Sequence, residues 1–434
     1  MIRHTFALVL TFLLLAGCAA QDPNAPVLDL VELEQNTGAY HGLPVNSPII
    51  SPEIQHQAYV QFIKEHFGPW DRTRPSHSAK EAFWGLTVYG SKKLYGENTL
   101  LRDSRWIRDM TEASRVEAYP SIGRRAITVT NSSLRVLPTN HPAFFDFNEA
   151  GEGFPFDYMQ NSLILAGTPL YASHASADGA WILVESRFAF GWVQTRDIAW
   201  VGTDFAKAYR TGAYVTLTTD SVPVTDSQGN YHFTGHIGTL IPVDGTTEQS
   251  FIIPVRDREG NALAIHASLP QGATETAPIP ATPANFARLA NTMLGLQYGW
   301  GGLYENRDCS ATTMDLMAAF GIFLPRNSGK QIEFGTQISL EGLNPEEKKE
   351  RILETAVPFM TLVRKPGHIM LYVGSRDNEP VVFHAIWGVK TKIGDGYGRK
   401  IIGTTAITTL EPGLEIDNLA TTLLDSVSLI SILP

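Results

Sequence analysis

Apolar and polar positions along the first part of the chain follow a helical pattern. Ser51 and Pro52 favour a helix start, with serine as the N-cap and proline at the first helical position. Apolar residues then recur at intervals of four, and residues 78–95 and 99–113 also favour helix. The stretch before Ser51 is rich in Pro, Asn and Gly, which is typical of a loop. The pattern therefore predicts a tether and a helical N-terminal region over residues 18–120.

From about residue 121 the pattern changes to short alternating runs separated by turn residues, such as "AITVT", "AWILVES" and "SFIIPVRD". These runs predict two small β-barrels, over residues 121–202 and 203–268. The stretch 269–282, which is rich in proline, is predicted to be a linker. Two motifs in the first barrel resemble bacterial SH3 (SH3b) domains: Leu134-Arg135-Val136-Leu137-Pro138-Thr139 and Gly191-Trp192-Val193.

The remaining part, residues 283–434, opens with a pattern of helix, loop and helix. In the second helix, Met314 and Met317 have helical spacing and Gly321 marks the end, so an amphipathic helix is expected to begin at Cys309. The free N–H groups and the dipole at a helix N-terminus lower the pKa of a thiol. We therefore expect Cys309 to be activated as a nucleophile. The alternative is that Cys309 is a small, buried core residue.

Two histidines lie in strand-like runs further along, His368 in "GHIMLYVG" and His384 in "PVVFHAIWG". The intervening "SRDNE" is turn-like, so the two runs predict an antiparallel hairpin. A turn centred on Arg376 would place the two imidazoles directly opposite each other on one face. A register slip of one residue would put them on opposite faces.

The N-terminal leader has a short basic start followed by an apolar run that is too short to span a bilayer. Leu15-Ala16-Gly17-Cys18 resembles a bacterial lipobox, which implies a lipoprotein signal peptide over residues 1–17 and acylation of Cys18. The alternative is an ordinary signal peptide cleaved near Ala19 or Ala20. The expected location is the periplasmic side of the bacterial cell envelope, with the protein anchored to a membrane by lipid.

Composition adds two constraints. The chain has 43% hydrophobic and 18% charged residues, as globular proteins do, and a formal net charge of −10 without a basic cluster, which argues against nucleic-acid binding. It holds only two cysteines. If Cys18 carries lipid, Cys309 has no disulfide partner within the chain, so its thiol is free to react.

Cys309, His368 and His384 define a candidate catalytic set. Cys309 would attack an amide carbonyl, and His368 would take the thiol proton and return it to the leaving amine. His384 would hydrogen-bond the other nitrogen of His368 and fix its tautomer. The backbone N–H of Cys309 and a donor from the region of Tyr298 would stabilise the oxyanion.

Four motifs follow one another in the C-terminal part of the chain: Tyr298-x-Trp300-Gly301-Gly302, Asp308-Cys309-Ser310, Leu324-Pro325-Arg326-x-Ser328 and Gly367-His368-Ile369-x-Leu371-Tyr372-x-Gly374. Together they resemble the NlpC/P60 family of papain-like cysteine peptidases. The resemblance implies an α+β domain in which the nucleophile helix packs on an antiparallel sheet that bears the histidines. It also implies cleavage of peptidoglycan stem peptides between D-γ-glutamate and diaminopimelate, without a cofactor or a metal.

Substrate contacts follow from the same resemblance. The family motifs imply that Tyr298, Asp308, Ser310, Asn327 and Ser328 line the substrate groove. A loop of the first barrel is expected to reach the groove and to bring Asp157 and Tyr158 to the substrate. Relatives that need a free L-alanine amine have an aspartate where this chain has Asn327, so the amide favours stem peptides still attached to glycan.

Two other functions remain open from the sequence. One is a muramoyl-alanine amidase or an acyltransferase on the same scaffold. The other is a catalytically inactive scaffold that binds the cell wall. The presence of all three residues Cys309, His368 and His384 argues against an inactive scaffold.

Overall fold

The computed structural model describes residues 25–245 and 250–434. The leader, with the predicted signal peptide and Cys18, lies outside these described residues. Within the two described ranges, none of the helices combines the length and the apolar character needed to cross a membrane.

The N-terminal region is helical, as predicted. Its main helix, α2, begins where the sequence predicts it, with the Ser51 hydroxyl accepting a hydrogen bond from the Ile54 N–H at 3.3 Å. Near its other end, Trp70 is fully buried and its indole N–H donates to the Ala126 carbonyl at 2.7 Å, which attaches the helix to the first barrel. The elements of this region are α1 (Asp29–Glu32), η1 (Thr37–Ala39), α2 (Pro52–Asp71), α3 (Ala79–Ala82), α4 (Trp84–Tyr89), α5 (Arg105–Ser114) and η2 (Val116–Ala118).

The segment before α2, predicted to be a tether, is instead packed on the C-terminal domain over residues 25–50. Thr37 is fully buried, and both its N–H and its hydroxyl donate to the Asn291 side chain at 2.9 Å. The Tyr40 carbonyl accepts from the Ser375 N–H at 3.2 Å. Polar side chains and backbone groups thus fix a stretch whose composition alone is typical of a loop.

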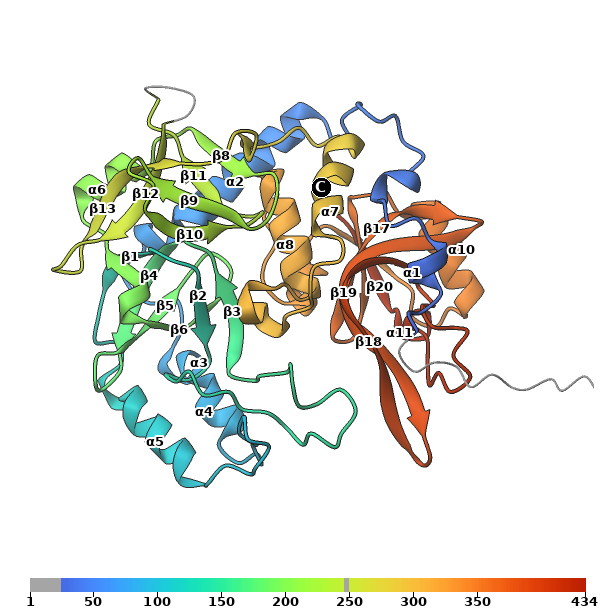
Figure 1. Cartoon of the computed structure of the whole chain (residues 1–434), viewed down its shortest axis with the longest axis horizontal. Coiled ribbons are helices and arrows are strands. Elements are labelled where there is room, and N and C mark those ends of the chain that lie inside the picture. The colour runs from blue at the N-terminus through green and yellow to red at the C-terminus, as the bar shows by residue number, and fades with distance from the viewer. Residues whose placement is uncertain (1–24, 246–249) are drawn as a thin grey trace, which may run out of the picture.

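The first barrel is an antiparallel sheet of seven strands in the order β3-β2-β6-β5-β4-β1-β7. Alternate residues of its strands fill a core that includes Leu134, Ile164, Leu170 and Val184. A long loop between β2 and β3 extends toward the C-terminal sheet (Figure 1). The elements are β1 (Arg124–Thr128), β2 (Ser132–Arg135), β3 (Gln160–Ile164), β4 (Pro169–Ala175), β5 (Trp181–Glu185), β6 (Phe190–Gln194), η3 (Thr195–Asp197) and β7 (Ile198–Trp200).

The second barrel consists of two small sheets, β10-β9-β13-β12 and β11-β8-β14. Its last strand, β14, lies within the stretch 269–282 that was predicted to be a linker, and it pairs with β8. Buried Ala273 and Ala277 flank this strand, so apolar packing holds the segment in place. The elements are α6 (Thr203–Tyr209), β8 (Tyr214–Leu217), β9 (Val222–Asp226), β10 (Tyr231–Gly235), β11 (Leu240–Pro242), β12 (Phe251–Arg256), β13 (Ala262–Ser268) and β14 (Thr274–Thr276).

The C-terminal domain is α+β, with helices packed on a six-stranded antiparallel sheet of order β15-β20-β16-β17-β18-β19. Stacked Phe286, Phe320 and Phe359 lie in its core, with the first two ring centroids 3.7 Å apart. The elements are α7 (Pro283–Met293), η4 (Trp300–Glu305), α8 (Cys309–Ala319), α9 (Ser328–Gln331), β15 (Thr336–Ser339), α10 (Pro345–Thr355), β16 (Thr361–Lys365), β17 (His368–Arg376), β18 (Glu379–Ile393), β19 (Gly396–Thr409), α11 (Leu423–Ser426) and β20 (Leu429–Ile432).

Helix α8 lies between the barrels and the C-terminal sheet (Figure 1). Every one of its residues is buried. The prediction of an amphipathic helix was therefore wrong, because the sheet covers one side and the neighbouring regions cover the other. A helix that is covered all round needs no polar face.

Candidate active site

Cys309 is the first residue of α8, as the sequence predicts. Asp308 precedes it as the N-cap, and one carboxylate oxygen accepts from the Ala311 N–H at 2.9 Å. The other oxygen accepts from the Gly301 N–H at 3.0 Å and from Arg326 Nη2 at 2.6 Å. Asp308 therefore fixes the start of the helix and the loop beside it, and it has few lone pairs left for a substrate.

Arg326 has no role in the sequence analysis, although it lies in a quoted motif. Its guanidinium donates to Asp308, to the Ser310 hydroxyl and, at 3.1 Å, to Ser162 of the first barrel. Arg326 is adjacent in sequence to Asn327 and Ser328, but its partners come from two other segments, the start of α8 and strand β3. Only the fold brings them together.

The glycines at 301 and 302 explain another part of the motif. Both have positive φ, +62° and +85°. A Cβ at Gly301 would lie 2.4 Å from the Gln160 carbonyl oxygen, and one at Gly302 would lie 2.3 Å from Leu163 Cβ. The loop before Cys309 thus presses against strand β3 of the first barrel, and only glycine permits this close approach.

The thiol of Cys309 is buried, with 7% of the residue exposed. Burial and the Asp308 charge raise the pKa of the Cys309 thiol to about 12, although a backbone N–H from Ile369 and the charge of Arg326 oppose the shift. The expectation that the helix N-terminus lowers this pKa was therefore wrong. Desolvation of the thiolate outweighs the dipole, so the resting side chain is a neutral thiol.

The two histidines meet, but not in the register that the sequence analysis expected. The hairpin turn is centred on Asp377 and Asn378, both with positive φ, rather than on Arg376. If the strand register set by this turn continued without a bulge, His384 would lie opposite Leu371. Leu371 is three residues from His368, so the two histidines would then lie on opposite faces of the sheet. A bulge at Val373, between Tyr372 and Gly374, shifts the pairing by one residue.

After this shift His384 lies opposite Met370, two residues from His368, so the two imidazoles lie diagonally on the same face. His368 Nε2 and His384 Nδ1 are 2.7 Å apart. Gly374 of the bulge has a φ of +133°, and a Cβ there would lie 2.0 Å from the Tyr40 carbonyl oxygen. The N-terminal segment therefore packs directly on the bulge that aligns the histidines.

A chain of hydrogen bonds fixes the tautomers. The Thr408 hydroxyl lies 2.6 Å from the Thr409 carbonyl, which can only accept, so the hydroxyl donates its proton there. Thr408 Oγ1 then accepts from His384 Nε2–H at 3.0 Å. His384 Nδ1 consequently accepts from His368 Nε2–H, which leaves the lone pair of His368 Nδ1 available as a base.

The imidazoles of His368 and His384 are both neutral. Burial lowers the pKa of His368 well below its usual range, and the charges of His384 and Lys365 lower it further. Burial also lowers the pKa of His384 to about 3, with a smaller contribution from Lys365. The site therefore holds a neutral thiol beside a neutral pair of histidines, and proton transfer has to accompany attack on a substrate.

Cys309 opens into a groove of about 810 Å³ between the helical region, the first barrel and the C-terminal domain. The groove brings together most of the residues expected from the sequence: Tyr158, Tyr298, Asp308, Ser310, Asn327 and Ser328. Across the reacting centre, His368 lines an adjoining cavity, and Tyr298, Trp300 and Gly367 line both.

The structure does not bring Asp157 to this groove. Its carboxylate is buried and accepts from Arg135 Nη1 at 2.7 Å and from the Ala143 and Met159 N–H groups. Tyr158, its neighbour in sequence, does line the groove, and its hydroxyl donates to Glu152 at 2.8 Å. The loop thus presents one of the two expected side chains, while the other holds the loop together.

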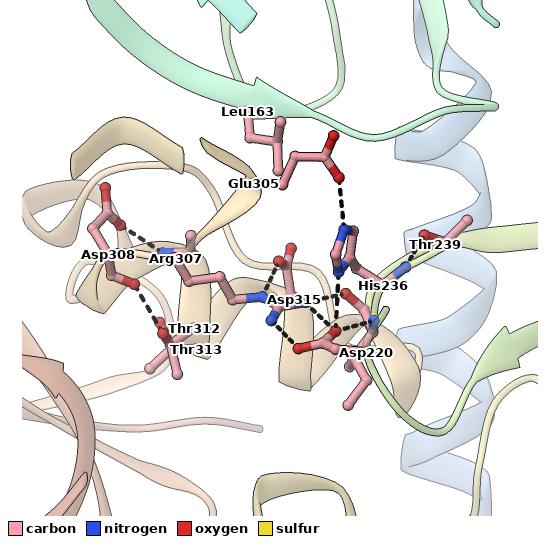
Figure 2. Close-up of polar contacts among 12 residues, drawn as sticks. Leu163, Asp220, His236, Thr239, Glu305, Arg307, Asp308, Thr312, Thr313 and Asp315 are labelled. Carbon is pink, nitrogen blue, oxygen red and sulfur yellow. Dashed lines mark hydrogen bonds and ion pairs between the residues drawn. The ribbon is translucent and has the colours of Figure 1, made fainter. Parts of the chain in front are cut away.

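A charged cluster holds the other side of the loop before Cys309 (Figure 2). Arg307 Nε donates to Asp315 of α8 at 2.7 Å, and its Nη2 donates to Asp220 of the second barrel at 2.8 Å. His236, also from the second barrel, lies between Asp220 and Glu305, with its Nε2 2.9 Å from the Glu305 carboxylate. The second barrel is thereby fastened to the residues that immediately precede the nucleophile.

Comparison with known proteins agrees with this geometry. Four family models match the chain: an NlpC/P60 stabilising N-terminal domain over residues 7–119, an SH3 domain of SH3b1 type over 142–194, an SH3 domain of SH3b2 type over 203–248, and the NlpC/P60 family over 295–393. Among curated proteins, no sequence matches the chain.

Among solved structures, an NlpC/P60 endopeptidase from Photobacterium damselae subsp. piscicida is similar, with 28% identity and a TM-score of 0.84 over 92% of this chain and 97% of that chain. An NlpC/P60 family protein from Bacillus cereus matches at 14% identity and a TM-score of 0.47, over 71% of this chain and 100% of that chain. The helix-start cysteine, the paired histidines and the family models together lead to one conclusion: the C-terminal part of this chain is an NlpC/P60 domain, and two SH3b domains precede it.

Proposed function

We propose that the protein is a cell-wall hydrolase that cleaves the amide bond between D-γ-glutamate and diaminopimelate in peptidoglycan stem peptides, with Cys309 as its nucleophile. The observation that carries this proposal is the chain from Thr408 through His384 to His368. This chain of hydrogen bonds leaves Nδ1 of His368 unprotonated. The next residue, Ile369, donates its backbone N–H to the Cys309 sulfur. Family membership supports the peptidase activity, and the resemblance of the motifs supports the choice of bond.

The reaction follows from these protonation states. Cys309 Sγ attacks the γ-carbonyl carbon of D-glutamate while its proton moves to His368 Nδ1. The carbonyl oxygen becomes an oxyanion, which the Cys309 N–H and the Tyr298 hydroxyl stabilise. His368 then protonates the leaving amine, the C–N bond breaks and a thioester remains. A water molecule gives a proton to His368 and attacks the thioester carbonyl. The C–S bond then breaks, the γ-carboxylic acid is released, and His368 returns the proton to the Cys309 sulfur.

The groove favours a stem peptide that is still attached to glycan. Asn327 is exposed at the groove, and its side-chain oxygen accepts from the Gly329 N–H at 2.8 Å. It carries no charge, so it cannot neutralise the ammonium of a free L-alanine. Kinetics on muramoyl-linked and free L-Ala-γ-D-Glu-diaminopimelate test this preference.

We expect kcat/KM for the linked peptide to be at least comparable to that for the free peptide, and Asn327→Asp to shift the ratio toward the free peptide by roughly 1–3 kcal/mol. The shift has the size of one hydrogen bond between a charged pair. A strong preference of the unmodified protein for the free amine would contradict the proposal.

We further propose that the protein acts in the periplasm as a lipoprotein, anchored through Cys18 after removal of residues 1–17. The lipobox-like sequence and the apolar leader support this, and a wall-bound substrate is accessible there. In the expressing cell, Cys18→Ser should release the protein from the membrane fraction without changing its activity on soluble stem peptides. A variant that still sediments with membranes would refute the lipid anchor.

Digestion of purified peptidoglycan, followed by mass analysis of the fragments, tests the bond that is cleaved. The proposal requires glycan fragments that end in L-Ala-γ-D-Glu and released peptides that begin with diaminopimelate. A muramoyl-alanine amidase would instead release the whole stem with its L-alanine. An inactive scaffold would release nothing beyond what a Cys309→Ala sample releases.

A further inference from the structure

The cavity on the His368 side of the reacting centre has an unusual charge. It measures about 320 Å³ and is lined by three cationic side chains, Lys365, Lys390 and Arg399, together with aromatic residues such as Trp300 and Trp387. None of the described residues that line it carries a carboxylate. In a chain of net charge −10, this is a local concentration of positive charge.

Among the described residues these cations have no carboxylate at ion-pair distance, and Lys390 Nζ instead lies over the Tyr397 ring, 3.4 Å from its centroid. Lys390 of β18 lies directly opposite Arg399 of β19 in the strand register, an arrangement of like charges that destabilises a sheet. Over the described ranges of the chain, no salt bridge joins Lys365, Lys390 or Arg399 to a carboxylate. Arg399 donates to the Glu152 carbonyl at 3.1 Å, and the Glu152 carboxylate, which Tyr158 binds, lies within its electrostatic reach.

The three cations therefore fit a ligand that brings carboxylate oxygens to this cavity. Trp300 and Trp387 line the same cavity and provide apolar surface for the carbon chain of such a ligand.

The mechanism determines which part of the substrate enters this cavity. His368 lines it, and His368 protonates the leaving amine, so the leaving group must lie on this side of the scissile bond. The acyl part then occupies the larger groove beside Cys309 and Asn327. This assignment rests on the proposed function.

We propose that the cationic cavity selects the leaving diamino acid by its carboxylates and thereby prefers diaminopimelate to lysine. Lys365 lies opposite His368 in the β16–β17 pairing. It is therefore placed to bind the carboxylate on the diamino-acid carbon that bears the leaving amine. Lys390 and Arg399 form the other cationic part of the cavity. Diaminopimelate carries a carboxylate beside its distal ammonium, so this end of the molecule is neutral overall. Lysine carries the ammonium alone, which the cations repel.

Three stem substrates with the same muramoyl-L-Ala-γ-D-Glu portion separate these effects. The first ends in meso-diaminopimelate, the second in diaminopimelate whose distal carboxyl is amidated, and the third in L-lysine. We expect kcat/KM for the first to exceed both others by at least about tenfold, the scale of one hydrogen bond to a charged group. Equal rates on all three substrates would overturn the inference while leaving the proposed function standing. Cleavage of none of them would refute the proposed function itself.

The double variant Lys390→Gln/Arg399→Gln tests the residues. The ratio of kcat/KM for the diaminopimelate stem to that for the lysine stem should fall about tenfold to a hundredfold. Lys392→Gln is the matched control, because this lysine lies exposed on the same strand outside the cavity and its ratio should not change. Because the readout is a ratio of two substrates, partial loss of folded protein cancels. An unchanged ratio in the double variant, or the same fall in Lys392→Gln, would overturn the assignment.

Discussion

Two buried polar clusters flank the start of α8, and they hold their protons in opposite ways. On one side, Cys309 and His368 are neutral. On the other, Arg307 and His236 are charged and bind carboxylates. Burial disfavours protonation of both His368 and His236. The pKa of His368 lies well below its usual range, whereas the pKa of His236 is nevertheless raised to about 8.

The neighbours account for the difference. His236 hydrogen-bonds the carboxylates of Asp220 and Glu305, which more than offset its burial. His368 faces His384 and Lys365 instead, and both disfavour its protonation. The comparison teaches that one cluster is suited to hold the loop in place through ion pairs, whereas the other keeps an unprotonated base for the reaction.

The largest expected effect is loss of hydrolysis when a residue of the uncharged cluster, Cys309, His368 or His384, is replaced. Cys309→Ala and His368→Ala should each lower kcat roughly 10⁴-fold or more, because nucleophile and base act as a unit. His384→Ala should cost less, on the order of 10- to 100-fold, since His384 only orients the base. Steady-state hydrolysis of a muramoyl stem peptide measures all three.

The fold should survive these changes, so thermal unfolding serves as the control for each variant. Hydrolysis by Cys309→Ala near the original rate would remove Cys309 from the mechanism. A more severe loss in His384→Ala than in His368→Ala would exchange the two roles.

The next effect is on the charged cluster and should appear in stability. Arg307→Met leaves Asp220 and Asp315 buried without their cation, which should reduce the free energy of unfolding by about 3–5 kcal/mol. Urea denaturation followed by fluorescence measures the loss. Arg196→Met is the matched control, because the Arg196 side chain is 80% exposed and its ion pair is 3.7 Å long, so its loss should cost less than about 0.5 kcal/mol. Equal stability of the two variants would contradict a locking role for Arg307.

His236 should make the same cluster sensitive to pH. Its pKa is raised from 6.5 to about 8 in the folded protein, so protonation stabilises the fold below pH 6.5 and this stability is lost as pH rises through about 8. The contribution is about 2 kcal/mol at most. His236→Gln should therefore be less stable than the unmodified protein at pH 6, and this pH-dependent part of the difference should vanish at pH 9. Urea denaturation at the two pH values compares them, and a difference that does not depend on pH would show that His236 is not charged in the fold.

The smallest effect concerns the hydrogen bond that orients the uncharged cluster. Thr408→Val removes the acceptor of His384 Nε2–H, which should lower kcat about threefold to tenfold, the scale of one hydrogen bond. Thr408→Ser keeps the hydroxyl and should restore the rate. The pH profile of kcat/KM should shift in the valine variant only, because the tautomer of His384 is no longer fixed. A valine variant with an unchanged rate and profile would exclude this role for Thr408.

Local patterns predicted the start of the site well, because they depend on neighbours in sequence. The helix that begins at Cys309 follows from apolar spacing and a terminal glycine, and the hairpin follows from alternation around a turn. The register did not follow, since the alternation does not reveal the bulge at Val373. The bulge packs against Tyr40, more than three hundred residues away in sequence.

Charge states and long-range partners could not be predicted for the same reason. The pKa of Cys309 depends on burial and on the charge of Asp308, and the position in the helix alone suggested the wrong direction. Thr408 and Arg326 acquire their roles only when the sheet and the loops are assembled. The stretch 269–282 looked like a linker because prolines are common in linkers, whereas strand β8 provides a partner for part of it.

The central claim is that Cys309 attacks the γ-carbonyl of D-glutamate, and covalent labelling tests it most directly. One probe is muramoyl-L-Ala-γ-D-Glu with a diazomethyl ketone at the γ-carbon, and a second carries the same electrophile at the muramoyl carboxyl, where an amidase would attack. The account predicts that the first probe inactivates the enzyme faster and alkylates the Cys309 sulfur with loss of N2. The peptide that contains Cys309 should gain the mass of the probe less that of N2, and Cys309→Ala should stay unlabelled. Faster labelling by the second probe, or modification at a residue other than Cys309, would contradict it.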